Sequence, residues 1–300
     1  MSATLAVAAA LLLDAWLGEA RRFHPLVGFG KLANFAERYL HADSRALGSA
    51  AVLLLIMPWT LLMILLGFTT WHVAIDILVL YLALGWHSLD AHAGQVMLRL
   101  HKDDLAGARQ QVGWMVSRDT ADLSQTSVTQ ATIESVLENG NDAIFGAIFW
   151  FIVAGAPGAL LYRLVNTLDA MWGYRNARYD RFGWAAARLD DCLNFIPARL
   201  TALSYALAGN VRHAMACWHR QGAAWKSPNA GPVMAAGAGS LQLTLGGSAC
   251  YHGKLEIRPL LGTGDAPGID DISRALGLIK RTLLLWLMIL CAGEWLIGHL

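Results

Sequence analysis

Acidic and basic side chains that could handle a phosphorylated substrate lie in a few short stretches of the chain. Glu134 and Glu138 are four residues apart in a segment with helical character, so both lie on one face of the predicted helix. Arg188 is followed closely by Asp190 and Asp191. Carboxylate oxygens are typical ligands of Mg²⁺, and guanidinium groups bind phosphate through paired hydrogen bonds. These residue types indicate a site for a hard cation and a polyanion.

A further polar stripe crosses an otherwise apolar segment. Arg163, Asn166 and Asp169 follow one another at helical spacing. Because an acidic side chain is costly to bury among apolar neighbours, the pattern favours a functional role for Asp169 over a purely structural one. Glu134 and Glu138 are less decisive, since their spacing is also typical of a solvated helix face.

The familiar nucleotide, acyl-enzyme and zinc motifs are absent from the sequence. There is no Walker A loop and no GxSxG, and residues 262–267 depart from GxGxxG at the last position. His213 and His219 are six residues apart, which does not match HExxH. No CxxC spacing exists, so the cysteines are interpreted as ordinary reduced thiols: Cys192, Cys217, Cys250 and Cys291.

The composition is that of a membrane protein. Of the 300 residues, 56% are hydrophobic and only 15% are charged, whereas soluble domains carry charge on about 25% of residues. The mean hydropathy is +0.42. A net charge of +1 gives no basic surface for nucleic acid, so a nucleic-acid partner is not expected.

The predicted fold is all-α: a polytopic membrane helical bundle with cytoplasm-facing polar helices, formed by residues 1–300 as a single domain. A helix needs about 20 apolar residues to cross a bilayer. The N-terminal run is predicted to be a retained helix, because no basic residue precedes Arg21 as a signal peptide would require. Glycines and prolines in 227–253 favour a packed loop or a broken helix. The predicted spans lie at about 3–17, 48–68, 71–90, 143–162 and 282–298.

The distribution of basic residues predicts the topology of these spans. Segments 18–45, 91–142 and 163–199 carry five, four and six Lys or Arg residues, and all three should face the cytoplasm. One full crossing at 143–162 would place the third segment outside. The run Gly155-Ala156-Pro157-Gly158 therefore predicts a re-entrant hairpin, with a single kinked span as the alternative.

Three classes of membrane protein fit the pattern: a transporter, an enzyme acting on a phosphorylated substrate, and a sensor. A transporter should concentrate polar residues within its spans and show two related halves. Here the polar clusters lie mainly between the apolar runs, and no internal repeat is present. The pattern favours an enzyme whose site lies at the cytoplasmic boundary of the membrane.

Longer motifs occur in order along nearly the whole chain. Asn166 begins the run NTLDAMWGYR, and Ala186 begins AARLDD. The others are Asp14, Gly18-Glu19, His24-Pro25, Arg118-Asp119-Thr120, Glu134-Ser135, Glu138-Asn139, Asp142, Tyr179, Phe182-Gly183, Pro197-Ala198-Arg199-Leu200-Thr201-Ala202 and Ser227-Pro228-Asn229-Ala230-Gly231. Together they closely resemble the adenosylcobinamide-phosphate synthase family of cobalamin biosynthesis. Many members carry a proline in the segment that reads Ala143–Phe149 here and a glutamate where Val233 stands, so no acidic role is expected at Val233.

This resemblance implies an ATP-dependent amide synthesis at the membrane of a bacterium. A carboxylate of adenosylcobyric acid would be joined to the amine of (R)-1-aminopropan-2-ol or its O-phosphate, giving adenosylcobinamide or its phosphate. The implied cofactor is Mg²⁺, with ATP as co-substrate and the corrinoid as substrate. The expected location is the inner membrane, with the active site on the cytoplasmic side; the lipid bilayer is a partner, and the oligomeric state is not predicted.

The resemblance also suggests a role for individual residues. Asp169, Glu134 and Glu138 are the expected catalytic residues and Mg²⁺ ligands, with Asp190 or Asp191 as a second source of carboxylate. Contacts to ATP or aminopropanol phosphate are expected from Arg118, Arg175, Arg188 and Lys226. Asn166 and Asn229 would orient substrate amides, and Tyr174 and Tyr179 would stack on adenine or the corrin rim. Arg188 and Asp191 could instead form a pair that holds a loop.

A non-catalytic alternative stays open at this point. The expected fold is similar to that of a membrane sensor associated with β-lactamase regulation, which lacks most of these motifs. A membrane sensor or scaffold protein of similar fold is therefore the second hypothesis, and an assay for corrin amidation distinguishes the two.

Overall fold

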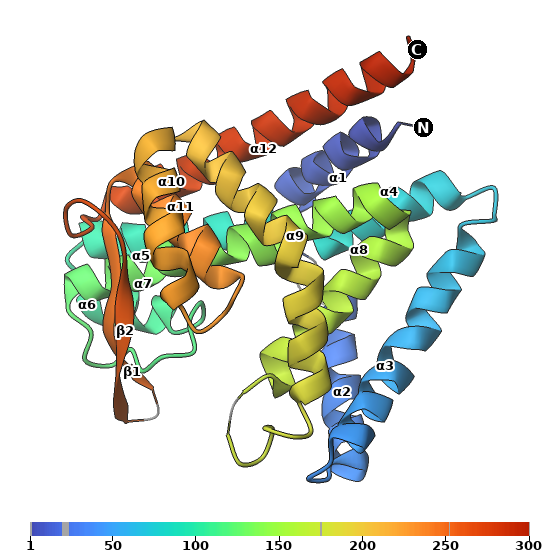
Figure 1. Cartoon of the computed structure of the whole chain (residues 1–300), viewed down its shortest axis with the longest axis horizontal. Helices are drawn as coiled ribbons and strands as arrows, with labels where there is room; N and C mark the ends of the chain where they lie inside the picture. Colours follow the sequence, from blue (N-terminus) through green and yellow to red (C-terminus); the bar gives the residue numbers. More distant parts are fainter. Residues whose placement is uncertain (1, 20–23, 175, 252, 300) are drawn as a thin grey trace. The chain divides into compact units, whose positions relative to one another are not determined.

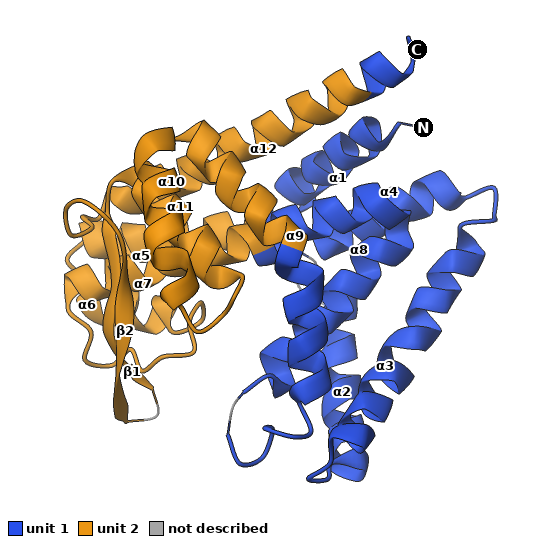
Figure 2. Ribbon diagram, in the orientation of Figure 1, with its two compact units in different colours: residues 1–86, 142–195, 294–300 blue, residues 87–141, 196–293 orange. Residues whose placement is uncertain are grey.

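The computed structural model of the chain describes residues 2–19, 24–174, 176–251 and 253–299. The fold is 74% helical with one small two-stranded sheet, which confirms the predicted all-α class apart from that sheet (Figure 1). The chain divides into two compact units (Figure 2). Unit 1 contains residues 1–86, 142–195 and 294–300, and unit 2 contains 87–141 and 196–293. That residues 1–300 form a single domain remains a prediction.

Unit 1 is built from apolar helices and the start of one polar helix. Its α2 begins at Pro25, a residue suited to the first helical turn, and His24 Nδ1 accepts a hydrogen bond from Leu26 N. The elements of unit 1 are α1 (Ala3–Leu17), α2 (Pro25–Leu40), α3 (Arg45–Leu66), α4 (His72–Ala83), most of the π-helical turn η1 (Asn141–Phe145), α8 (Gly146–Trp172) and the first half of α9 (Trp184–Ala208).

Unit 2 holds the remaining helices and the hairpin of two strands. Strands β1 and β2 pair antiparallel, from Thr244 opposite Gly262 to Tyr251 opposite Lys254, with a register shift at Gly246/Gly247. The elements are α5 (Trp86–His101), α6 (Leu105–Val112), α7 (Gln125–Gly140), the second half of α9, α10 (Val211–Gln221), the 3₁₀ turn η2 (Gly222–Ala224), α11 (Ala230–Leu241), β1 (Thr244–Tyr251), β2 (Lys254–Gly262) and most of α12 (Asp271–Ile297).

Four helical segments of the described chain are long and apolar enough to cross a membrane: 45–66, 72–101, 125–172 and 271–297. The apolar helix α1 is shorter, at 15 residues. Each predicted span overlaps one of these helices. The span predicted at 71–90 is interrupted, because α4 ends at Ala83 and Leu84 is extended. Gly85 N then donates to Ala143 O at 3.0 Å instead of continuing the helix.

The segment predicted as a hairpin reverses direction within α8. Ala154 and Gly155 leave the helical conformation, and Gly155 has a φ of +62°, which favours glycine. A Cβ at Gly158 would lie 2.3 Å from Trp150 O, and one at Gly146 would lie 2.2 Å from Tyr162 Oη. The two arms therefore pack antiparallel through glycines (Figure 1). The reversal is confirmed; entry and exit on one side of a membrane stay a prediction.

The core of unit 1 lies where α2, α3 and α8 meet the start of α9. Trp172 and Phe182 are fully buried, and their rings lie 5.0 Å apart at 60°. Gly48 allows α3 to approach the main chain closely, since a Cβ there would lie 2.0 Å from Phe182 O. Close packing of this kind holds the polar face of α8 against α9.

Unit 2 contains a core cluster of small residues. Ala202, Ala206, Ala214 and Ala236 form a buried cluster between α9, α10 and α11. Every residue of α11 is buried. The loop or broken helix expected within 227–253 is therefore wrong for 230–241, because alanine and glycine let a continuous helix fit between its neighbours.

Candidate functional site

The predicted site residues are divided between the two units. Arg175 lies outside the described residues. Arg118, Glu134, Glu138, Lys226 and Asn229 belong to unit 2. The rest belong to unit 1: Asn166, Asp169, Tyr174, Tyr179, Arg188, Asp190 and Asp191.

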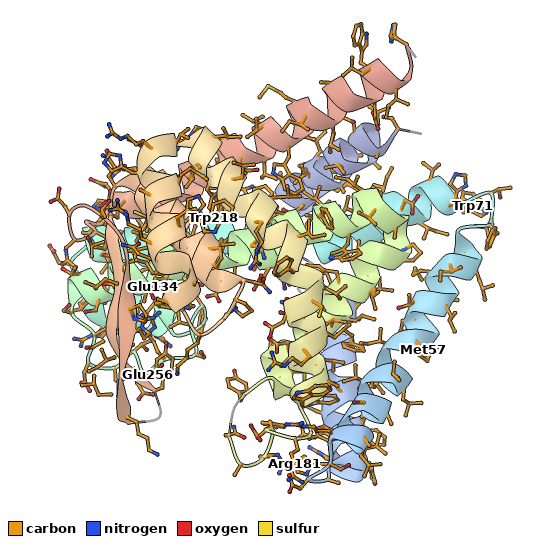
Figure 3. All side chains as sticks on the ribbon, viewed as in Figure 1. Met57, Trp71, Glu134, Arg181, Trp218 and Glu256 are labelled. Carbon is orange, nitrogen blue, oxygen red and sulfur yellow. The ribbon has the colours of Figure 1, made fainter. Side chains whose placement is uncertain are left out.

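Glu134 forms the centre of a buried charged cluster in unit 2. Its side chain is 2% exposed, which excludes a solvated helix face at this position. Arg118 pairs with Oε2 from the loop before α7. Arg258 on β2 donates to Oε2 at 2.9 Å and to Oε1 at 3.2 Å. Two guanidinium groups and one carboxylate give this cluster a net positive charge (Figure 3 labels Glu134).

The hairpin and the α7 side chains complete the hydrogen bonding of Glu134. Gly246 N donates to Oε1 at 2.8 Å, and Gln130 Nε2 donates to the same oxygen at 3.0 Å. Gly246 has a φ of +83°, and a Cβ there would lie 2.1 Å from Pro259 O, so the position requires glycine. Glu134 thus ties α7 to the glycine bulge of β1.

Arg258 is a residue whose importance sequence reasoning missed. Burial alone lowers the pKa of its guanidinium, but the adjacent Glu134 carboxylate raises that pKa above its usual value. The guanidinium carbon also lies 5.2 Å from the centre of the Trp225 ring, a cation–π contact. The sequence did contain a signal for Arg258. It is the one arginine in the largely apolar run LEIRPLLG, and a charged side chain buried there needs a partner of opposite charge.

These contacts favour a structural role for Glu134. Both carboxylate oxygens already accept from positive or neutral donors, so a Mg²⁺ ion would have to compete with two arginines. Glu138 lies one turn further along α7 and is partly exposed. The metal roles of Glu134 and Glu138 stay predictions.

The polar turn before α11 is fixed by Arg199. This side chain bonds to Asn229 Oδ1 and donates to Pro228 O at 3.0 Å. Burial lowers the pKa of the Arg199 guanidinium. Ser227 Oγ accepts from Ala230 N at 3.2 Å, which connects the turn to the first residue of α11. Lys226 pairs with Glu256 and is 75% exposed, so it stands at the surface of unit 2.

Unit 1 holds a row of side-chain hydrogen bonds between α8 and α9. Asp190 accepts from Asn166 Nδ2 at 3.3 Å and from Asn194 Nδ2 at 3.0 Å. Tyr162 donates to Asn194 Oδ1 at 2.8 Å. Arg163 donates to Asn166 Oδ1 at 3.1 Å. The structure thus brings together Asn166 and Asp190, which the sequence placed 24 residues apart.

The environment of Asp190 shifts its acidity. Burial raises the pKa of the Asp190 carboxyl above its usual value, and the Asp191 charge acts in the same direction. The amides of Asn166 and Asn194 oppose this shift by donating to the carboxylate. A carboxylate stabilised by neutral amides is easier to protonate than one paired with an arginine.

Asp169 lies on the same stripe of α8, one turn beyond Asn166, and is partly exposed. A Cβ at Gly173 would lie 2.0 Å from Asp169 Oδ1, so the carboxylate occupies the space above that glycine. Gly173 N donates to Asp169 O at 2.7 Å and closes the helix. The helical stripe predicted around Asp169 is confirmed.

The other predicted residues of unit 1 lie nearer the surface. Arg188 Nη1 lies 3.4 Å from Asp191 Oδ2, and the arginine is 58% exposed. The predicted pair therefore forms, but within α9 and not in a loop. Tyr174 is exposed.

Glu37 organises the loop after α8, and sequence reasoning gave it no role. Its Oε1 accepts from Tyr179 Oη at 3.0 Å and from Arg178 Nη2 at 2.7 Å. Trp172 Nε1 donates to Oε2 at 3.1 Å. Hydrogen bonds to Glu37 raise the pKa of Arg178. The signal for Glu37 in the sequence was its place on the apolar face of α2, because an acidic side chain that is buried there needs a hydrogen-bond or ion-pair partner.

A metal site formed by protein side chains alone does not fit the arrangement. Among the described residues, no group of three His, Cys, Asp or Glu side chains could hold a metal ion together. Mg²⁺ is commonly bound by one or two carboxylates together with substrate phosphates and water, so a nucleotide-borne ion needs no such group.

Comparison with known proteins identifies the family. The family model described as "CobD/Cbib protein" matches residues 7–279. The chain is 54% identical over 303 residues to "Cobalamin biosynthesis protein CobD" of Stutzerimonas stutzeri and 52% identical over 308 residues to that of Chromobacterium violaceum, each covering 99% of both chains. The Mycobacterium tuberculosis relative of the same name is 41% identical over 90% of this chain and 88% of its own. No solved structure matches. The resemblance seen in the motifs is confirmed: the chain belongs to the CobD/Cbib family and takes part in cobalamin biosynthesis.

Proposed function

We propose that the chain catalyses ATP-dependent amide synthesis, joining (R)-1-aminopropan-2-ol or its O-phosphate to a carboxylate of adenosylcobyric acid. The product is adenosylcobinamide or its phosphate. The observation that supports this reaction most strongly is the identity of 54% to a cobalamin biosynthesis protein over 99% of both chains. The ordered motifs around Asn166 and Asp190 support it as well.

The proposed chemistry follows from the poor reactivity of a carboxylate. A carboxylate oxygen of the corrinoid attacks the γ-phosphorus of ATP, ADP leaves, and an acyl phosphate forms. The neutral amine of aminopropanol then attacks the carbonyl carbon, inorganic phosphate leaves, and the nitrogen loses a proton. Arg118, Arg175, Arg188 and Lys226 are the proposed contacts for these phosphate groups.

The hydrogen-bonded row of unit 1 supports a role in orienting a substrate. Asn166 is already fixed between Arg163 and Asp190, so its position does not depend on a ligand. Such preorganisation lowers the entropic cost of aligning reacting groups. Asn229 is fixed by Arg199 in the same manner within unit 2. Tyr174 and Tyr179 remain the proposed stacking residues, although Tyr179 is anchored to Glu37 through its hydroxyl.

Mg²⁺ is proposed to arrive with ATP, where it offsets phosphate charge. Asp169 is the residue best suited as its protein ligand, being partly exposed on the polar stripe. Glu138, Asp190 and Asp191 are the further proposed carboxylates. Glu134 is the least suited, because it already contacts Arg118 and Arg258.

The proposed location is the bacterial inner membrane with the active site on the cytoplasmic side, where ATP is available. The four membrane-length helices of the described chain support the membrane location. The arginine-rich segment 163–199 supports the cytoplasmic side.

The test is a reconstituted reaction with purified protein in detergent. Adenosylcobyric acid, ATP, Mg²⁺ and either aminopropanol or its phosphate are combined, and the corrinoid product and ADP are both quantified. We expect amide product in proportion to ADP, lost when any one component is omitted. Corrinoid amidation without ATP consumption would contradict the ligase mechanism. Absence of both would favour the non-catalytic scaffold.

A further inference from the structure

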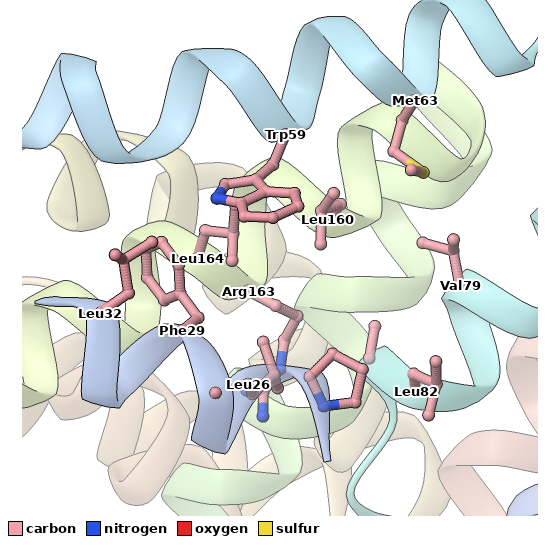
Figure 4. A pocket seen from close by; sticks show the side chains of 13 residues that line it. Leu26, Phe29, Leu32, Trp59, Met63, Val79, Leu82, Leu160, Arg163 and Leu164 are labelled. Atoms are coloured by element: carbon pink, nitrogen blue, oxygen red, sulfur yellow. The ribbon is translucent and has the colours of Figure 1, made fainter. Parts of the chain in front are cut away.

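Arg163 and Arg118 both keep guanidinium nitrogens without a hydrogen-bond partner among the described residues, but only one of them can meet a ligand. Arg163 lines an apolar cavity of about 460 Å³ between α2, α3, α4 and α8 of unit 1 (Figure 4). Its unpaired Nε is enclosed by protein, so no ligand can bind there. The Arg118 side chain in unit 2 is only 9% exposed, yet its unpaired Nε and Nη1 are not enclosed. Arg118 therefore presents N–H groups that a ligand can reach.

The main chain on either side of Arg118 is held in place by unit 2. Ser135 Oγ on α7 donates to Met115 O at 3.0 Å. Asp119 N donates to Cys250 O on β1 at 2.9 Å. The loop that carries Arg118 thus has a fixed position before any ligand binds, and such preorganisation strengthens binding.

The guanidinium of Arg118 is held by Glu134, and Arg258 offsets the charge of that acid. Arg118 Nη2 donates to Glu134 Oε2. Glu134 alone would cancel the charge of Arg118. Arg258 prevents this, because its Nη1 and Nη2 donate to Oε2 and Oε1 of Glu134 at 2.9 Å and 3.2 Å. The three side chains keep a net positive charge, which favours an anion such as phosphate at the unpaired N–H groups of Arg118.

Arg258 itself has no guanidinium nitrogen left for a substrate. Its Nε donates to Gly247 O at 3.0 Å, and its Nη2 donates to Gly246 O at 3.3 Å as well as to Glu134. Its side chain is 6% exposed. Since all three nitrogens are used within the protein, an effect of Arg258 on a ligand has to pass through Glu134 to Arg118.

We propose that Arg258 is a positioning residue for a substrate phosphate. Arg258 fixes the Glu134 carboxylate, Glu134 fixes the guanidinium of Arg118, and the remaining N–H groups of Arg118 bind the phosphate. This phosphate belongs to ATP or to aminopropanol phosphate, and the experiment distinguishes the two sources. The inference rests on the proposed function, because it takes Arg118 as a phosphate contact of the amide synthesis.

Arg258→Lys separates the position of the cluster from its charge. Lysine keeps the positive charge but lacks the planar fork that holds both oxygens of Glu134. Arg274→Lys is the matched control. Arg274 also lies in unit 2 and joins a carboxylate, that of Asp271, to a main-chain oxygen, Leu241 O.

The experiment measures equilibrium binding of radiolabelled ATP and, separately, of radiolabelled aminopropanol phosphate to purified protein in detergent with Mg²⁺ and without a corrinoid. Arg258→Lys should weaken the binding of at least one ligand by about tenfold, and that ligand carries the phosphate bound by Arg118. Arg274→Lys should change neither dissociation constant by more than about twofold. A protein that binds these ligands but makes no amide would contradict the proposed function and leave the positioning role of Arg258 supported.

A double-mutant cycle tests whether Arg258 acts through Arg118. In the Arg118→Gln background, Arg258→Lys should weaken binding by less than about twofold, because the guanidinium that it positions is gone. The proposal is overturned if Arg258→Lys binds both ligands as tightly as the unchanged protein does, or if its loss is equally large in the Arg118→Gln background. Absence of saturable binding of both ligands to the unchanged protein would also overturn it.

Thermal unfolding checks that each variant is folded. If Arg258→Lys does not fold, Gln130→Ala takes its place, because the uncharged Gln130 Nε2 also holds Glu134, donating to Oε1 at 3.0 Å. We expect binding about threefold weaker than in the unchanged protein, and only while Arg118 is present. Unchanged binding in Gln130→Ala would then overturn the proposal.

Discussion

The two units stabilise a buried carboxylate in different ways. In unit 2, Glu134 lies between Arg118 and Arg258, so its charge is more than compensated. In unit 1, Asp190 is held by the neutral amides of Asn166 and Asn194. Charge pairing fixes a group in one state, whereas amide hydrogen bonds leave it able to change protonation. The first arrangement is suited to joining elements and the second to chemistry.

The largest expected effect comes from breaking the charged cluster. Glu134→Ala leaves two buried guanidinium groups without their carboxylate, which should lower the free energy of unfolding by about 3–5 kcal/mol. Thermal unfolding in detergent measures this loss. Glu256→Ala is the control, since it breaks the solvent-exposed pair with Lys226 and should cost at most about 1 kcal/mol. Equal losses in both variants would contradict the structural role of Glu134.

Asp169→Asn should remove activity without removing the fold. The amide keeps the shape of the side chain but loses the charge proposed to bind Mg²⁺. We expect amidation to fall by about 100-fold, in the range seen when one charge-stabilising group is removed, with unchanged thermal unfolding. A lower yield of folded protein at constant specific activity would show that Asp169 acts only on stability.

Glu138→Gln and Arg175→Lys should separate metal binding from phosphate binding. The first variant should need more Mg²⁺ for half-maximal rate and recover partly at high Mg²⁺. The second should raise KM for ATP or aminopropanol phosphate by about tenfold, because lysine lacks the planar fork of arginine. Added metal should not rescue it. If both variants responded identically to Mg²⁺, the assignment of metal binding to Glu138 and of phosphate binding to Arg175 would be wrong.

The smallest expected effect concerns Asp190 and pH. Because the pKa of Asp190 is raised by folding, its contribution favours the folded state below the ordinary pKa of aspartate and disappears as pH rises through the raised pKa. Asp190→Asn should therefore flatten the fall in thermal stability that begins as the pH rises above the ordinary pKa of aspartate, about 4. Asp43→Asn is the control, since Asp43 faces the exposed Arg181 and should leave the slope in place. A steeper slope in Asp190→Asn would reverse the assignment.

Sequence reasoning located the elements that depend on local pattern. The apolar runs predicted α1, α3 and α12, and the run from Gly155 to Gly158 predicted the reversal in α8. The hairpin of β1 and β2 was missed, because its glycine-rich strand lacks regular alternation of apolar and polar residues. Pairing of this strand depends on Arg258 and Glu134, which are 124 residues apart.

The residue types of the site were predictable from the sequence, but most of their hydrogen-bond and ion-pair partners were not. Asn166, Asp169 and Asp190 stood out because polar residues in apolar surroundings are unusual, and the structure places Asn166 against Asp190. The partners Arg258 and Glu37 did not, because the sequence does not show which distant residue a charged side chain contacts once it is buried. Only the tertiary fold shows which of these charges are buried.

The reversal of α8 has a consequence for the order in which the chain assembles. Ala156 N, at the start of the second arm, donates to Asp76 Oδ1 at 3.1 Å. Asp76 lies within α4 and leaves the ribosome 80 residues before its donor does. During synthesis, the Asp76 carboxylate is therefore present in an apolar segment before its hydrogen-bond donor, Ala156 N, has been made. A nascent chain that stops before Ala156 would therefore lack this hydrogen bond to the Asp76 carboxylate.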